Sequence, residues 1–134
     1  MKSLICLCMS LALFNLNVVW AHDGHHGPAV TLDMHKELLD IPGKEAIMLT
    51  VDYKPGEVEV KHKHDAHCFV YVLEGSIVMG VKDGPEQTLL PGQTFYEGPN
   101  DIHTVGRNAS KTESAKFLVI MFKDKGKPPV MPVE

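Results

Sequence analysis

Apolar and polar residues alternate along several short stretches of this chain, and Pro or Gly separates one stretch from the next. In residues 47–53 an apolar side chain stands at every odd position and Met, Thr or Asp at the even ones, and Lys54-Pro55-Gly56 follows. Successive side chains of an extended strand point to opposite faces. The pattern therefore predicts a half-buried β-strand that ends in a turn.

Other stretches, which either alternate in the same way or are short and nearly continuous in apolar residues, predict more strands over residues 58–64, 68–73, 76–82, 87–90, 94–96, 102–105 and 116–122. Asp83-Gly84-Pro85 and Pro91-Gly92 have the residues of tight turns. A helical period is visible only over residues 34–39, which is short for a helix. Many short strands separated by turns predict an all-β sandwich or barrel.

The stretch from residue 57 to 68 adds chemistry to this pattern. Even positions 58 and 60 are Val and continue into His62 and His64, opposite a face of Glu and Lys at odd positions. Because the Val face should enter the core, we expect both histidines to point inward. Cys68 has the same parity, whereas His67 should face away. The alternative is a solvated edge strand whose Lys and His side chains protect it from pairing.

A third histidine, His103, follows the turn residues Gly98-Pro99-Asn100 at the start of another predicted strand. A barrel can bring that strand beside His62 and His64, so that three imidazoles share its interior. Three His ligands suit Zn, Fe, Cu, Ni or Mn and leave coordination positions open. Glu97 and Asp101 lie nearby and either could act as a general base, although ordinary loop carboxylates are the simpler interpretation.

The N-terminus has the features of an export signal. Lys2 is followed by an apolar run from Leu4 to Leu13, and Val19-Trp20-Ala21 is a small-x-small cleavage pattern, so we expect residues 1–21 to be removed. The run is too short for a membrane span. We therefore expect a periplasmic or secreted protein with Cys68 as its only cysteine and with no intramolecular disulfide.

Charge and composition narrow the partners of the expected mature chain. The full sequence has a formal net charge of −4, and the expected signal contributes only Lys2 to it. This acidic balance gives no support to nucleic-acid binding, which rests on a basic surface. The new N-terminus would carry His22, His25 and His26 in a Gly-rich stretch. Such a stretch either binds Cu or Zn loosely or is a polar, unstructured tail.

Two motifs resemble those of small single-domain cupins, over roughly residues 45–122. The first motif is matched by Gly56, His62, His64 and Gly75 at the family's spacing, with Cys68 where a glutamate is usual. In the second motif Gly92 and His103 fall in register, but Gly98-Pro99-Asn100 departs from Pro-x-Gly and Asn108 comes one residue late.

The resemblance implies a jelly-roll barrel, also called a double-stranded β-helix, which is often dimeric and holds one divalent metal. It assigns His62, His64 and His103 as ligands, and Cys68 occupies the position of the fourth. A thiolate there would favour Zn, Cu or Fe over Mn. Cys68 is therefore a ligand, a non-ligating neighbour of a three-His site, or a sign that the site has lost its metal.

One branch of the family, the thiol dioxygenases, also places a Cys near the glutamate position and cross-links it to a Tyr late in the chain. Residues 117–122 contain no Tyr. The resemblance to that branch is therefore partial.

These expectations divide the chain into a signal peptide (1–21), a His-rich lead-in (22–44), a cupin barrel (45–122) and a C-terminal tail (123–134) that leaves the domain. Two functions remain open. The first is an enzyme, an oxygenase or isomerase acting on a small organic molecule at the three-His site. The second is a non-catalytic protein that binds or sequesters a metal or small ligand. A homodimer is expected from the resemblance, and no membrane span is expected after signal cleavage.

Overall fold

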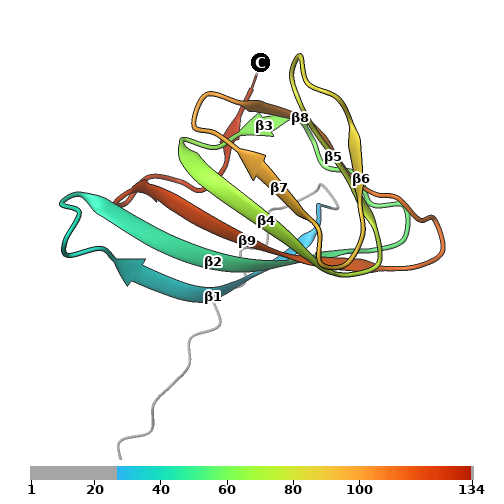
Figure 1. Ribbon diagram of the computed structural model, residues 1–134, viewed down its shortest axis with the longest axis horizontal. Helices are drawn as coiled ribbons and strands as arrows, with labels where there is room; N and C mark the ends of the chain where they lie inside the picture. Colours follow the sequence, from blue (N-terminus) through green and yellow to red (C-terminus); the bar gives the residue numbers. More distant parts are fainter. Residues whose placement is uncertain (1–26, 134) are drawn as a thin grey trace, which may run out of the picture.

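The computed structural model describes residues 27–133, and these form an all-β molecule of two facing antiparallel sheets. The first sheet has the order β1-β2-β9-β4-β7 and the second β10-β3-β8-β5-β6 (Figure 1). The strands are β1 (Ala29–Glu37), β2 (Lys44–Tyr53), β3 (His62–Lys63), β4 (Ala66–Glu74), β5 (Ile77–Val81), β6 (Gln87–Leu89), β7 (Thr94–Glu97), β8 (Ile102–Asn108), β9 (Ala115–Asp124) and β10 (Met131–Pro132).

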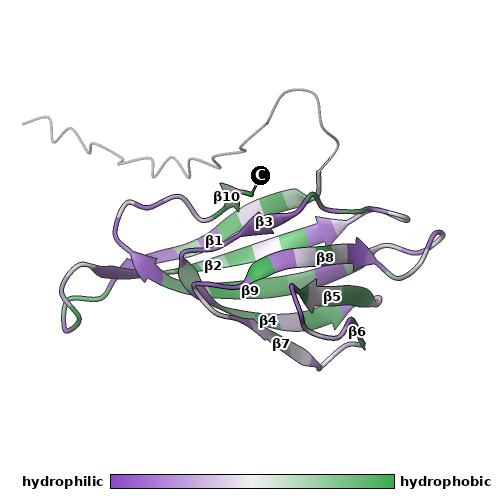
Figure 2. Cartoon of the chain, turned by 90° about the horizontal axis from the view of Figure 1, so that it is seen from above, coloured by the Kyte–Doolittle hydropathy of each residue, from purple (hydrophilic) through white to green (hydrophobic). Residues whose placement is uncertain are grey.

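The strand alternation predicted from the sequence is confirmed in β4, the strand that follows the two histidines. Its side chains alternate strictly from Ala66 to Val72, with even-numbered residues buried and odd-numbered ones exposed. Figure 2 shows hydrophobic and hydrophilic residues interspersed along the strands of both sheets. Cys68 consequently lies inside, and His67 lies outside.

The core fills the space between the sheets with apolar side chains from six strands, β2, β4, β5, β6, β7 and β9. Its most deeply buried members, each below 2% exposed, are Tyr53, Cys68, Val70, Val72, Ile77 and Met79. Burying an aliphatic side chain contributes about 1.5–3 kcal/mol, so this cluster supplies much of the drive to fold.

Both ends of the predicted barrel extend further than the sequence patterns indicated. The lead-in contains β1, which pairs with β2 over Ala29 to Glu37 and includes the residues with the short helical period. The tail returns as β10 and pairs with β3. The expected signal peptide and the N-terminal histidines lie outside the described residues. Residues 27–133 contain no helix long and apolar enough to cross a bilayer.

The prediction that residues 58 and 60 enter the core was wrong. Val58 and Val60 are 62% and 74% exposed, whereas Glu59 turns inward. Only residues 62 and 63 form a strand in this stretch, and before them the chain meets β8 through an isolated antiparallel bridge between Val58 and Arg107, to which the hydrogen bond from the Glu59 N–H to the Gly106 carbonyl belongs. The side-chain parity therefore shifts by one before His62, which still points inward with His64.

The backbone conformation and close contacts at Gly75 explain why the first motif has a glycine at this position. It has a φ of 69°, a left-handed backbone that favours glycine. A Cβ there would lie 2.4 Å from the Ser114 carbonyl oxygen and 2.8 Å from the Ala115 Cα. The turn after β4 thus requires both the conformation and the missing side chain.

Candidate metal centre

Three buried histidines from two strands of the second sheet meet in the interior. His62 pairs with His103 across β3 and β8, and His64 follows two residues later. One ring nitrogen from each lies within 4.8 Å of the others. Nε2 of His62 is 3.1 Å from Nε2 of His64 and 3.3 Å from Nδ1 of His103. The structure therefore brings together the three histidines expected from the sequence.

The opposite nitrogen of each ring faces a backbone carbonyl. His62 Nδ1 lies 2.9 Å from the Val60 oxygen, His64 Nδ1 2.6 Å from the Pro129 oxygen, and His103 Nε2 2.6 Å from the Val105 oxygen. A carbonyl oxygen only accepts hydrogen bonds, so each of these nitrogens must carry the hydrogen. In the neutral rings the three remaining nitrogens present lone pairs to one another.

Two carboxylates approach the same nitrogens. Glu97 Oε2 lies 3.7 Å from His64 Nε2 and 3.5 Å from His103 Nδ1, and it has no hydrogen-bond partner although it is buried. Glu59 Oε2 lies 3.9 Å from His62 Nε2 and 3.8 Å from His103 Nδ1. The site is therefore a set of three imidazoles with two carboxylates close by, both of which approach His103.

Burial dominates the proton affinities here. Loss of solvent lowers the pKa of His64 and of His103 to about 4, so both rings are neutral at pH 7. Loss of solvent, with the charges of Glu59 and Asp101, raises the pKa of Glu97 to about 8. Burial likewise raises the pKa of Glu59. His64 and His103 therefore offer lone pairs to the site, and burial disfavours the charged form of the two carboxyl groups beside them.

Cys68 does not belong to the histidine cluster. It is fully buried in β4 and pairs with Glu97 of β7 across the first sheet. Burial, and after it the charge of Glu97, raises the pKa of the thiol well above its usual range. β7, the neighbour of the cysteine's strand, therefore places the Glu97 carboxylate beside Cys68 and close to two of the histidines.

Gly106 makes room for this arrangement. A Cβ at that position would lie 2.6 Å from Glu59 Oε2 and 3.0 Å from the Cε1 atom of His103. Its carbonyl accepts from the Glu59 N–H at 2.8 Å, which holds the irregular stretch against β8. A side chain at 106 would push Glu59 away from the site.

Of the two carboxylates near the histidines, Glu97 could be placed inside the protein from its sequence pattern, whereas Glu59 could not. In Thr94-Phe95-Tyr96-Glu97 the apolar Phe95 and Glu97 share a face, and both are buried. Glu59 was placed on the wrong face because its strand is irregular. Asp101, the other carboxylate considered, accepts a hydrogen bond from the Gly98 N–H at 2.7 Å and so closes a turn.

Asn108 also has a structural role. Its Nδ2 donates to the carbonyl oxygens of Lys54 at 3.0 Å and Glu113 at 2.7 Å, and its Oδ1 accepts from the Ser110 N–H. The residue that fell one position late in the second motif thus ties the loop after β2 to the loop between β8 and β9.

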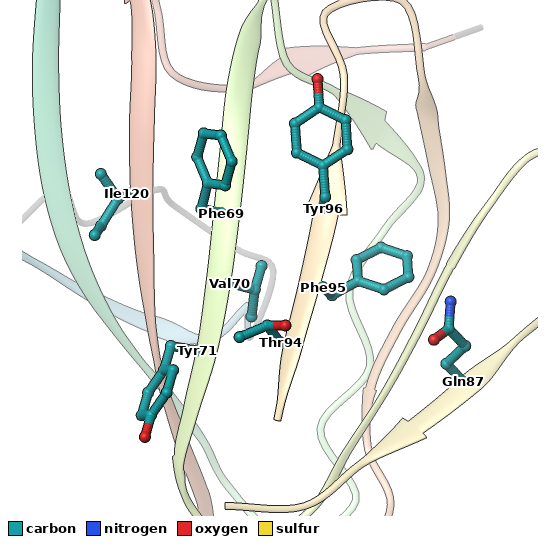
Figure 3. Close-up of a pocket in the computed structure, with 8 residues that line it drawn as sticks. All are labelled: Phe69, Val70, Tyr71, Gln87, Thr94, Phe95, Tyr96 and Ile120. Carbon is teal, nitrogen blue, oxygen red and sulfur yellow. The ribbon is translucent and has the colours of Figure 1, made fainter. Parts of the chain in front are cut away.

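His67 and Tyr96 lie on the outer face of the first sheet. His67 Nδ1 and the Tyr96 hydroxyl are hydrogen-bonded at 2.7 Å, and the two rings stack. Figure 3 shows Tyr96 beside Phe69 on the neighbouring strand, around a groove of about 600 Å³ that includes Tyr71. None of the site histidines lines this groove.

The donor set fits a transition-metal ion. Three inward lone pairs with no hydrogen to share, and a buried carboxylate oxygen without a partner, are costly to bury unless a cation satisfies them. Imidazole ligands whose second nitrogen donates to a carbonyl are the usual arrangement around bound metals.

Comparison with known proteins agrees with this fold. Residues 49–121, more than half of the chain, match the cupin domain family. No curated protein matches the sequence.

Solved structures give the same result for the fold. An uncharacterised protein with a double-stranded β-helix domain from Klebsiella pneumoniae is 13% identical, with a TM-score of 0.63 over 85% of this chain and 92% of that one. An oxalate oxidase is 23% identical, with a TM-score of 0.63 over 83% of this chain and 57% of its own. The polyketide cyclase RemF from Streptomyces resistomycificus is 24% identical, with a TM-score of 0.56 over 78% and 71%.

The similarity also reaches the DMSP lyase DddQ from Ruegeria pomeroyi, 21% identical with a TM-score of 0.57 over 64% of this chain. The chain spans 42% of that enzyme's length. At these identities the likeness establishes the shared fold.

Proposed function

This chain belongs to the cupin family, and from that premise we propose that it is an exported metal-binding cupin that acts as an enzyme on a small organic molecule. The observation that carries the proposal is the convergence of three histidine lone pairs whose opposite nitrogens are all held by carbonyls. Histidines that bind a metal almost always donate a hydrogen bond from their second ring nitrogen, and these three rings have that arrangement.

In this proposal His62, His64 and His103 hold a divalent transition metal, and Glu97 supplies the carboxylate that the first motif lacks. Glu97 approaches two of the histidines, while Cys68 is the non-ligating neighbour behind it. A carboxylate in place of a thiolate restores Fe and Mn beside Zn, Cu and Ni as suitable metals.

The bound metal would supply a Lewis acid with open coordination positions. The carbonyls and carboxylates of the chain around it have separate roles. The carbonyls fix the three rings, and Glu59 lies close to His62 and His103 with its side chain 15% exposed. We assign Glu59 as the group that takes or gives a proton at the substrate, which suits oxygenase or isomerase chemistry.

The solved neighbours support a small-molecule substrate. Their names describe an oxalate oxidase, a polyketide cyclase and a DMSP lyase, all of which act on small molecules. Because they share the fold at low identity, they support the class of substrate and not a particular reaction.

The second candidate is a non-catalytic protein that binds or sequesters a metal or small ligand. It is favoured by the depth of the site, because His62, His64 and His103 are no more than 8% exposed. The sequence His22-Asp23-Gly24-His25-His26 adds a second set of metal-binding side chains.

Metal analysis of untagged protein, with oxygen uptake measured in parallel, separates the two functions. One equivalent of Fe or Mn with turnover of a small organic substrate supports the enzyme, whereas tightly bound Cu or Zn without turnover supports the binding protein. His62→Ala and His103→Ala should each abolish stoichiometric metal. Unchanged metal content in both variants would refute the site.

Export is tested separately. The mature protein should begin at His22 and, because Trp20 is the only tryptophan, should lack tryptophan fluorescence. Protein purified from the cytosol with its first residues intact would contradict this part of the proposal.

We also propose a homodimer, in keeping with the family. The outer face of the first sheet exposes a cluster of aromatic rings of which Phe69, Tyr71, Tyr96 and Phe122 are 41–48% exposed. A second copy would cover this surface. Light scattering on Phe69→Ser and wild-type protein tests it, and a monomeric wild type would refute it.

A further inference from the structure

The C-terminal strap, residues 125–132, joins the two sheets beside the histidine cluster. It leaves β9 of the first sheet through a turn at Gly126, whose φ is 75°, and ends as β10 on the second sheet. There Pro132 pairs with His62 and Met131 with Lys63. In Figure 1 the end of the chain accordingly lies beside β3.

A buried lysine anchors the beginning of this strap. The Lys123 side chain is 4% exposed, and its Nζ donates to Glu45 Oε1 and, at 2.5 Å, to the Lys127 carbonyl oxygen. Glu45 Oε1 also accepts from the Gly126 N–H at 3.3 Å. One buried ion pair therefore holds both the turn and the first residue after it.

The strap carries one atom of the site. The Pro129 carbonyl oxygen accepts the His64 Nδ1 hydrogen at 2.6 Å. His62 and His103 are oriented by carbonyls two residues away in their own segments, whereas the acceptor for His64 is 65 residues distant. Two consecutive prolines restrict the backbone at this point, which presets the direction of the carbonyl.

We propose that Lys123 is a positioning residue for the metal centre, and that it acts through the strap by holding the Pro129 carbonyl against His64. This inference rests on the proposed function insofar as His64 is a metal ligand. When the strap is docked, His64 keeps its hydrogen on Nδ1 and turns the Nε2 lone pair to the site. When the anchor is lost, the ring can rotate or change tautomer, and the third ligand is no longer preformed.

The matched test compares two double variants that each remove one cross-strand ion pair between β2 and β9. Lys123→Met with Glu45→Met removes the anchor without leaving an unpaired buried carboxylate. Lys116→Met with Asp52→Met removes the exposed pair of the same two strands, whose Lys116 Nζ lies 3.3 Å from Asp52 Oδ1. Both are made in the full chain.

Two readouts are taken. The first is the ¹⁵N NMR signature of His64 in metal-free protein, which reports the tautomer. The second is Co²⁺ affinity, measured by competition with a chromophoric chelator, together with the visible Co²⁺ spectrum. The anchor variant should lose the pure Nδ1–H tautomer and bind Co²⁺ about 10–100-fold more weakly. The control should match the wild type within about twofold.

A failure of the metal site and a failure of the strap proposal give different experimental results. A wild type that binds no Co²⁺ refutes the metal site, and the tautomer measurement still decides the role of the strap. A folded anchor variant with the wild-type tautomer and affinity refutes the strap proposal alone. If the anchor variant does not fold, Pro128→Gly with Pro129→Gly loosens the strap and keeps the anchor. A mixed His64 tautomer in that variant supports the proposal, and an unchanged one overturns it.

Discussion

The interior of this protein has two parts that are equally buried and differ in how well their groups are satisfied. Val72, Ile77 and Met79, all at most 1% exposed, belong to a cluster of buried hydrophobic side chains. Around the three histidines and Glu97, 3–8% exposed, lone pairs face one another and a carboxylate oxygen has no partner. The first part stabilises the fold. The second is costly to bury without a ligand, and such local conflicts mark functional sites.

The largest expected effect tests the apolar part. Ile77→Ala leaves a cavity among fully buried side chains, so the free energy of unfolding should fall by about 2–5 kcal/mol. Urea denaturation measures it, and metal stoichiometry should stay unchanged because the change does not touch the site. Val60→Ala is the control, because Val60 is 74% exposed and should cost less than about 0.5 kcal/mol. A large loss of metal in Ile77→Ala would show that the two parts are not separable.

The polar part should respond in the opposite way. Glu97→Gln removes the carboxylate charge beside two histidines, so metal affinity should fall about 10–100-fold, or roughly 1.4–2.7 kcal/mol. The metal-free protein should lose no stability. Isothermal titration gives the affinity, and Cys68→Ala is the matched comparison on the paired strand. If Cys68→Ala weakened metal binding more than Glu97→Gln, the cysteine would be the ligand.

Acid should weaken the ion pair that anchors the strap. The Lys123 ammonium, and after it the hydrogen bond from His35, lowers the pKa of Glu45 to about 2 from its usual 4.5. The unfolded chain therefore takes up this proton first as pH falls. The contribution, about 3 kcal/mol, is fully present above pH 4.5 and is lost between there and about pH 2. Urea titrations of the wild type and Glu45→Gln should differ above that window and converge within it. Curves that stay parallel would contradict the assignment.

The smallest expected effect concerns the boundary between the two parts. Gly106→Ala puts a methyl group against Glu59 and His103, so one of them must move, at a cost of about 1–2 kcal/mol. Turnover should fall more than metal content, because Glu59 is displaced before the three ligands are. Gly80→Ala on the adjacent strand, where the nearest atom would be 3.4 Å away, should leave turnover unchanged. Equal losses in the two variants would remove Glu59 from the mechanism.

Regular strands were predictable because their side-chain parity is written into the sequence. β2 has the alternation that residues 47–53 indicate, and β4 and β9 form where the nearly continuous apolar runs at 68–73 and 116–122 predict strands. Parity failed where the backbone is irregular. Glu59 and Val60 exchanged their expected faces because residues 59–61 belong to no strand, so the pairing with β8 is interrupted between the Val58–Arg107 bridge and His62. β1 was missed since all nine of its residues are exposed and no buried face marks it as a strand.

The sequence by itself determined the all-β class, the three histidines as a group and the departure at Cys68, because spacing along a strand fixes which side chains can share a face. Only the tertiary structure decided what completes the site. Glu97 lies across a sheet from Cys68, and the Pro129 carbonyl reaches His64 over 65 residues. A backbone carbonyl leaves no mark in a sequence, and contacts between distant strands depend on register and packing that local patterns do not encode.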